Sequence, residues 1–122
     1  MAEFLQIPPL EIHGRSHWKL VDELVYLSDL WPDPITVPTG FVTDLASIPR
    51  IPGVRALIPQ NGAHRAPAIV HDFLVRSDGF DRPLADRIFL EAMEAVGVKR
   101  WRRTLMFWAV RIQTAWLTWR KQ

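Results

Sequence analysis

Residues 65–97 have the sequence RAPAIVHDFLVRSDGFDRPLADRIFLEAMEAVG, which predicts two helices joined by a short turn. Apolar side chains recur every three or four positions in both halves, which is the spacing of one helix face. The first helix is expected over residues 65–76, where a Ser-Asp-Gly turn ends it. The second is expected to begin near Pro83, with Asp81 as its N-cap, and to stop at Gly97. Two helices joined by so short a turn pack antiparallel.

The residues before this helix pair predict short β-strands. His17–Leu20 and Glu23–Leu27 are strand-like segments on either side of a Val-Asp pair, so we expect them to form a hairpin. Ile35–Val37 predicts another short strand, which ends at Pro38 because proline has no backbone N–H to donate to a sheet.

The chain is therefore expected to be a single α+β domain with four parts. A domain of 122 residues can bury a core without metal or disulfide support. The expected parts are a β-rich segment over residues 1–40, a loop over 41–64, the antiparallel helix pair over 65–98 and a basic, Trp-rich helix over 99–122.

Composition excludes several kinds of chemistry. The chain has no cysteine, which excludes a disulfide framework, a thiolate nucleophile and a Cys-based zinc site. Residues 1–5 offer neither a basic region nor an apolar core of a signal peptide, so we expect the protein in the host cytoplasm or in a virion rather than secreted by such a signal.

Charge is unevenly distributed along the chain. Residues 1–98 carry eight Lys/Arg against thirteen Asp/Glu, whereas residues 99–122 carry seven Lys/Arg and no acid. Apolar residues of this last segment recur four and three apart and form one stripe: Trp101, Leu105, Trp108, Ile112, Ala115 and Trp119. We expect the stripe to pack on the domain, as such stripes usually do. An interfacial membrane helix and an oligomer contact are the alternatives. Arginines interrupt any run long enough to cross a bilayer.

Three ionisable residues of the helix pair are candidates for chemistry. His71 and Asp72 lie between apolar neighbours in the first helix, so both are expected to be partly buried and to need partners. Asp86 lies on the side of the second helix that carries Phe89 and Met93, so its carboxylate points inward. We therefore predict a hydrogen bond between His71 and Asp86.

Asp44, in the loop that begins at Gly40, is a further candidate. We expect it to approach Asp72, either around a cation or by pairing with an arginine such as Arg50. The structural alternative is that Asp44 caps a short turn, while His71, Asp72 and Asp86 form a polar network that only holds the helices together.

Several motifs in a fixed order are similar to those of a phage and prophage family of domains of unknown function. They are TDLASIPR at 43–50, HDFL at 71–74, ADRIFLEAM at 85–93, WRR at 101–103 and AVR at 109–111. The resemblance covers roughly residues 15–112 and implies a phage-encoded origin, often near tail or lysis genes.

The helix pair also resembles the two-helix core of phospholipase A2 enzymes. That resemblance implies that His71 is the general base for water, that Asp86 orients its imidazole, and that Asp72 binds Ca²⁺ together with loop carbonyls. The chain departs from this pattern at Val75, where the family has an aromatic residue, and it lacks the family's disulfides and glycine-rich calcium loop. Residues 40–44, with Gly40 and Asp44 at their ends, would have to supply the metal site.

Two functions follow as expectations. The one we favour from the sequence is a virion component, in a tail or baseplate, or an assembly-associated protein that uses the His-Asp core as a structural network. The alternative is a Ca²⁺-dependent hydrolase of lipid or envelope esters. Expected partners are phage structural proteins, a second copy bound through the C-terminal helix, or a membrane surface. We do not expect nucleic acid, because no DNA-reading motif accompanies the basic run Lys99–Arg103.

Overall fold

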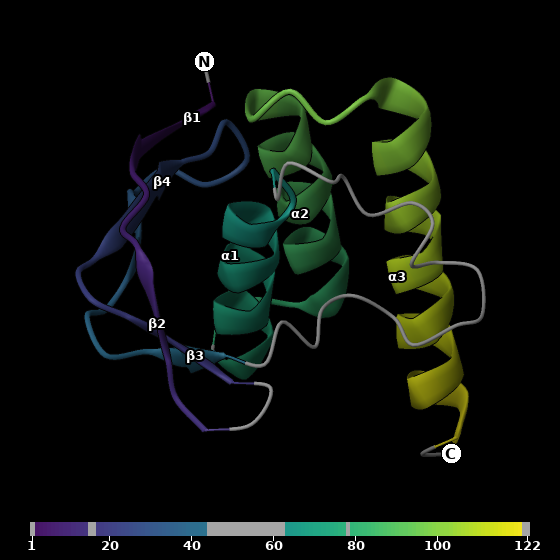
Figure 1. The fold of residues 1–122 in the computed structure, drawn as a ribbon. Helices are drawn as coiled ribbons and strands as arrows, with labels where there is room; N and C mark the ends of the chain where they lie inside the picture. The colour runs from purple at the N-terminus through teal and green to yellow at the C-terminus, as the bar shows by residue number, and fades with distance from the viewer. Residues whose placement is uncertain (1, 15–16, 44–62, 78, 121–122) are drawn as a thin grey trace.

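The fold consists of six short strands followed by three helices, which confirms the predicted α+β class (Figure 1). The computed structural model describes residues 2–14, 17–43, 63–77 and 79–120, and it describes side chains up to residue 112 in the last of these ranges. In these ranges the strands form one layer, helices α1 and α2 form the next, and α3 lies on the far side of α2 (Figure 1).

The strands form two antiparallel sheets of three strands each. The first has the order β1-β4-β5 and the second the order β2-β3-β6. The strands are β1 (Glu3–Gln6), β2 (Leu10–Ile12), β3 (Trp18–Leu20), β4 (Leu24–Leu27), β5 (Ile35–Val37) and β6 (Val42–Thr43).

The predicted hairpin between the segments 17–20 and 23–27 is wrong. These segments do become the consecutive strands β3 and β4, but β3 pairs with β2 and β6, whereas β4 pairs with β1 and β5. The chain changes sheets just after β3, where the Val21 N–H is bonded to the Pro9 carbonyl at 3.4 Å. Strand β6 also lies inside the segment that was expected to be loop.

The helix boundaries agree closely with the sequence pattern. Helix α1 spans Arg65–Arg76, α2 spans Arg82–Ala95 and α3 spans Arg100–Arg120. The Asp81 side chain caps α2 by accepting a hydrogen bond of 2.7 Å from the Leu84 N–H. At the other end of α2, Gly97 has a φ of +83°, and the Val98 N–H reaches back to the Met93 carbonyl at 3.0 Å. This is a Schellman cap, which requires the left-handed conformation that glycine adopts readily.

Two apolar clusters hold the layers together. The larger lies between the strands and the helix pair, and includes Leu24 and Tyr26 of β4, Ile69 and Leu74 of α1, and Ile88 of α2. The smaller lies where α1, α2 and α3 meet, and consists of Ala68, Phe89, Met93, Val98, Met106 and Val110. Because α1 and α2 contribute to both clusters, the helix pair is the centre of the domain.

The prediction that the apolar stripe of the last helix packs on the domain is wrong over the described side chains. Trp101, Leu105, Trp108 and Ile112 are all exposed, by 49–60% of their surface. The helix instead packs through Met106, Ala109 and Val110, which lie on a different face. Ala115 and Trp119, the remaining members of the stripe, lie beyond the described side chains.

Candidate functional site

A buried polar cluster lies where the three helices approach one another. His71 comes from α1, Asp86 from α2 and Arg111 from α3. The side chains of His71 and Asp86 are 3% and 0% exposed, so both groups have been removed from water. An ionisable group in this position costs several kcal/mol unless it is paired. The bonds within the cluster offset part of that cost.

The predicted hydrogen bond between His71 and Asp86 is present. The distance from Nε2 of His71 to Oδ1 of Asp86 is 2.6 Å, and the His71 ring lies beside Phe89 with ring centroids 5.2 Å apart. A carboxylate accepts hydrogen bonds and does not donate them when ionised, so Nε2 carries the proton that it donates to Asp86. This bond fixes the orientation of the ring, as carboxylate partners of histidine do.

Arg111 is a partner of Asp86 that the sequence did not indicate. Its Nη1 lies 3.5 Å from Oδ2 of Asp86, while its side chain stays 36% exposed. The two oxygens of Asp86 therefore face two different helices. No local spacing links residues 86 and 111, so only the packing of α3 on α2 reveals this contact.

Asp72 points to a different set of partners on the strand side of α1. Its Oδ2 accepts a hydrogen bond of 2.6 Å from the Thr43 hydroxyl, and its Oδ1 lies 3.1 Å from Nε of Arg76. Asp72 and Arg76 are four residues apart on one helix, a spacing that predicts an ion pair and could have identified this partner. Arg50, the arginine through which Asp44 was expected to pair near Asp72, lies outside the described residues.

Arg76 also contacts the beginning of β6 and the residue before it. Its Nη1 donates a hydrogen bond of 3.0 Å to the Val42 carbonyl, and its guanidinium lies over the Phe41 ring, 5.2 Å from the centroid. Phe41 in turn meets Phe73 edge to face, with centroids 5.7 Å apart. Residues 41–43 are thereby held against the C-terminal half of α1.

The predicted calcium ligands are only partly described. Asp44 lies outside the described residues, although its neighbour Thr43 contacts Asp72 directly. Gly40 has a φ of +87° and donates its N–H to the Leu20 carbonyl at 2.9 Å. Calcium takes six to eight oxygen ligands, whereas the part of the chain that the structure describes has no group of three His, Asp or Glu residues placed to hold a metal.

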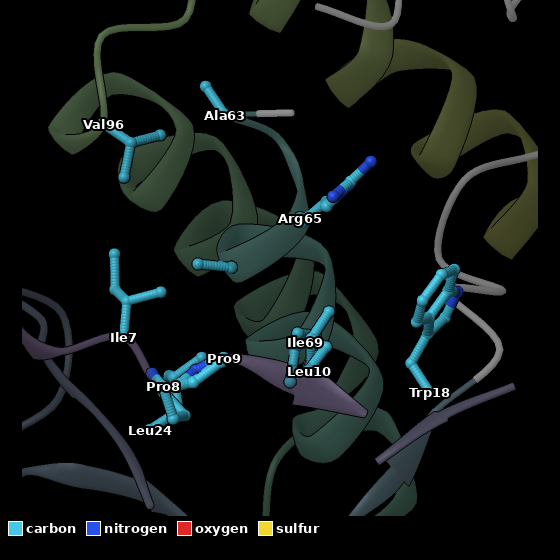
Figure 2. Close-up of a pocket in the computed structure, with 11 residues that line it drawn as sticks. Ile7, Pro8, Pro9, Leu10, Trp18, Leu24, Ala63, Arg65, Ile69 and Val96 are labelled. Atoms are coloured by element: carbon cyan, nitrogen blue, oxygen red, sulfur yellow. The ribbon is translucent and has the colours of Figure 1, made fainter. Parts of the chain in front are cut away.

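A hollow of about 480 Å³ lies elsewhere, between the N-terminal strands and the beginning of α1 (Figure 2). Ile7 and Trp18 approach it from the strand layer, and Ile69 and Arg65 from α1. Its lining is mainly apolar, with the Arg65 guanidinium as the charged group at its border (Figure 2). His71, Asp72 and Asp86 do not line it, so this hollow and the polar cluster are separate features of the molecule.

His64, at the N-cap of α1, is the other buried histidine. It is 6% exposed, and its Nδ1 has no hydrogen-bond partner. Burial lowers the pKa of His64, and the positive charge of neighbouring Arg65 lowers it further. Both effects disfavour the charged form of His64.

These features define a small α+β domain whose three helices share a buried His-Asp-Arg cluster. The chain belongs to the family described as protein of unknown function (DUF1353), which it matches over residues 18–110. The matched region includes His71 and Asp86. It ends at Val110, one residue before Arg111.

One relative is an uncharacterised protein of Sinorhizobium fredii named y4jT, which is 34% identical to this chain over 80 residues. The matched segment is 66% of this chain, and the chain spans 23% of the length of that relative. No solved structure matches the chain.

Proposed function

We propose that this chain is a phage- or prophage-encoded hydrolase of ester bonds in lipids or the cell envelope, with His71 as general base. The observation that carries the proposal is the bond of 2.6 Å between His71 and Asp86. A carboxylate that holds one nitrogen of an imidazole fixes its tautomer and prepares the other nitrogen to accept a proton. The phage origin is supported by the ordered motifs that resemble a phage and prophage family.

The proposed reaction uses His71 and Asp86 in different roles. His71 takes a proton from water, and the resulting hydroxide attacks the ester carbonyl. The carbon–oxygen bond to the leaving group then breaks, and the imidazolium returns the proton to the leaving alkoxide. Asp86 stabilises the imidazolium through Nε2 without itself being protonated. Arg111 holds the second oxygen of Asp86, so it acts as a positioning residue for the carboxylate.

A virion or assembly component is the second candidate. It is favoured by the burial of the cluster, since His71 is only 2% exposed and the carboxylates of Asp72 and Asp86 both have cationic partners. In that case the cluster stabilises the packing of three helices, and the protein acts by binding other phage structural proteins.

The test is hydrolysis of phospholipid vesicles and of a soluble ester by the wild-type chain and by His71→Gln. We expect wild-type activity, and a loss of at least about 100-fold in the variant, the usual size of a general-base contribution. His13→Gln is the matched control, because His13 is exposed on the strand side of the chain. Equal rates in wild type and His71→Gln, or no hydrolysis by the wild type, would reject the hydrolase and favour the virion or assembly role.

Calcium is proposed as a cofactor and is tested separately. If Asp72 takes part in a Ca²⁺ site completed by Asp44 and by oxygens outside the described residues, saturating Ca²⁺ raises the thermal midpoint of the wild type through linkage. Asp72→Asn should abolish that shift. The absence of any Ca²⁺-dependent shift in the wild type would remove calcium from the proposal and leave the roles of His71 and Asp86 intact.

A further inference from the structure

Helix α3 presents an apolar surface on the side that faces away from the domain. Trp101, Leu105, Trp108 and Ile112, which we call the α3 stripe, are exposed by 52%, 49%, 57% and 60%. Their spacing of four, three and four residues places them on one face of the helix. Monomeric proteins rarely leave so many large apolar side chains in one contiguous patch without a use for them.

Cations border the α3 stripe on both sides. At about 100° per residue, Arg100 and Arg111 lie on one border of the stripe and Arg102 lies on the other. Arg102 stacks over Trp101, with its guanidinium carbon 4.6 Å from the ring centroid. Lys99–Ile112 contains five Lys/Arg and no acid, so the stripe lies in a surface of a single charge sign.

A shallow hollow lies on the Arg100 border. It is lined by Arg100, Trp101, Thr104 and Leu105, and its volume is about 560 Å³. An apolar recess beside a guanidinium suits a molecule that has an apolar chain next to an anionic group.

We propose that α3 binds the surface of an anionic phospholipid bilayer, with the α3 stripe among the acyl chains and the bordering Arg100 and Arg102 at the phosphates. Interfacial helices have this composition, with Trp and Leu on one face and Lys or Arg beside it. The helix lies along the surface and does not cross it, since no described helix is long and apolar enough to span a bilayer.

The charge pattern favours a bilayer over a second copy of the chain. Two α3 stripes packed face to face would bring Arg100 of each copy close to the cations of the other, and Lys99–Ile112 has no acid to pair with them. An anionic bilayer supplies the missing negative charge, because anionic lipid surfaces attract clustered Lys and Arg side chains. The proposal does not depend on hydrolysis.

The test is co-sedimentation with vesicles of ether-linked lipids, which contain no ester to hydrolyse. We expect binding to equal parts of phosphatidylglycerol and phosphatidylcholine, with a blue shift of tryptophan emission, and little binding to pure phosphatidylcholine. High salt should weaken the binding because it screens the cations.

Two variant pairs identify the surface. Leu105→Ser with Trp108→Ser should weaken binding by about 10-fold or more, since two apolar side chains no longer enter the bilayer. Ile12→Ser should bind normally, because Ile12 is an apolar residue of β2 that is even more exposed, by 74%. Arg100→Gln with Arg102→Gln should also weaken binding, whereas Arg87→Gln on α2 should not. Binding that is absent, or that the stripe variants leave unchanged, would overturn the proposal. So would a wild-type dimer that the stripe variants dissociate and that does not bind vesicles.

Discussion

Asp86 shows how one carboxylate can connect three helices. It is completely buried, and its two oxygens contact His71 of α1 and Arg111 of α3. Its burial is tolerated because a cation and an imidazole N–H replace the water that it has lost. The inward direction of Asp86 could be predicted from its position among the apolar residues of α2, and so could its bond to His71. The contact with Arg111 could not be predicted, because it depends on the packing of α3 on α2.

Tyr26 is another buried residue with a polar group, and the ionisation of its hydroxyl can be measured directly. Its hydroxyl donates a hydrogen bond of 2.6 Å to Glu91 of α2, and Glu91 also accepts the Asp29 N–H at 3.0 Å. Burial raises the pKa of Tyr26 well above its ordinary value, and the hydrogen bond and negative charge of Glu91 raise it further.

The raised pKa of Tyr26 predicts an alkaline limit to stability. Below about pH 10 the hydroxyl is protonated in both the folded and the unfolded chain. Above that pH the unfolded chain loses the proton first, so the stability that Tyr26 contributes is lost as the pH rises further. Tyr26 is the sole tyrosine of the chain, so ultraviolet absorbance of tyrosinate reports on it alone.

We expect tyrosinate absorbance to rise only together with the loss of circular dichroism. Tyr26→Phe, which keeps the ring that packs against Phe4 at a centroid distance of 4.6 Å, should show no such absorbance and is the control for scattering and tryptophan signals. Ionisation near pH 10 while the circular dichroism stays native would contradict the burial and bonding of Tyr26.

At the level of elements, the helices follow from local sequence and the sheets do not. Helix α2 has its N-cap at Asp81 and its C-terminal glycine at Gly97, and these local features define its ends. The strands β3 and β4 were located correctly, but nothing in their composition distinguishes a hairpin from two strands in different sheets. The two strands pair instead with strands from residues 3–12 and 35–43, which lie on either side of them in the sequence.

The exposed stripe of α3 could not be predicted either, because periodicity shows which residues share a face but not which face is covered. The covered face of α3 is the one with Met106 and Val110, which meet Phe89 and Met93 of α2. Arg111 lies beside Val110 at the edge of that contact. Its approach to Asp86 depends on which face of α3 is covered, so it could not be predicted either.

The contact between Arg111 and Asp86 predicts a measurable link between α3 and the helix pair. Arg111→Met removes the cation and keeps a similar length of apolar side chain, so Asp86 loses its contact with the guanidinium. We expect the free energy of unfolding in urea to fall by about 1 kcal/mol, a modest value because the guanidinium is partly exposed. Arg100→Met, an exposed position at the start of the same helix, should change it by less than about 0.5 kcal/mol. Equal effects of both variants would show that the contact contributes nothing specific.

In the whole molecule, the helix pair is the layer that links every other part. Its strand-facing side carries Asp72, whose bonds to Thr43 and Arg76 hold residues 41–43 against α1. Its other side carries the cluster of His71, Asp86 and Arg111. The consecutive residues His71 and Asp72 thus have different partners, His71 on α2 and Asp72 on β6 and α1. The role of one residue can therefore be tested without removing the partners of the other.

The central claim is that His71 and Asp86 act as one catalytic unit, and a double-mutant cycle on ester hydrolysis tests it most directly. The rates of wild type, His71→Gln, Asp86→Asn and the double variant are compared, with circular dichroism confirming that each chain is folded. Residues that act as a unit give losses that do not add. We predict that the double variant is as slow as His71→Gln alone, because Asp86 acts only through the imidazole. Losses that multiply in the double variant, or hydrolysis that neither single substitution slows, would contradict the account.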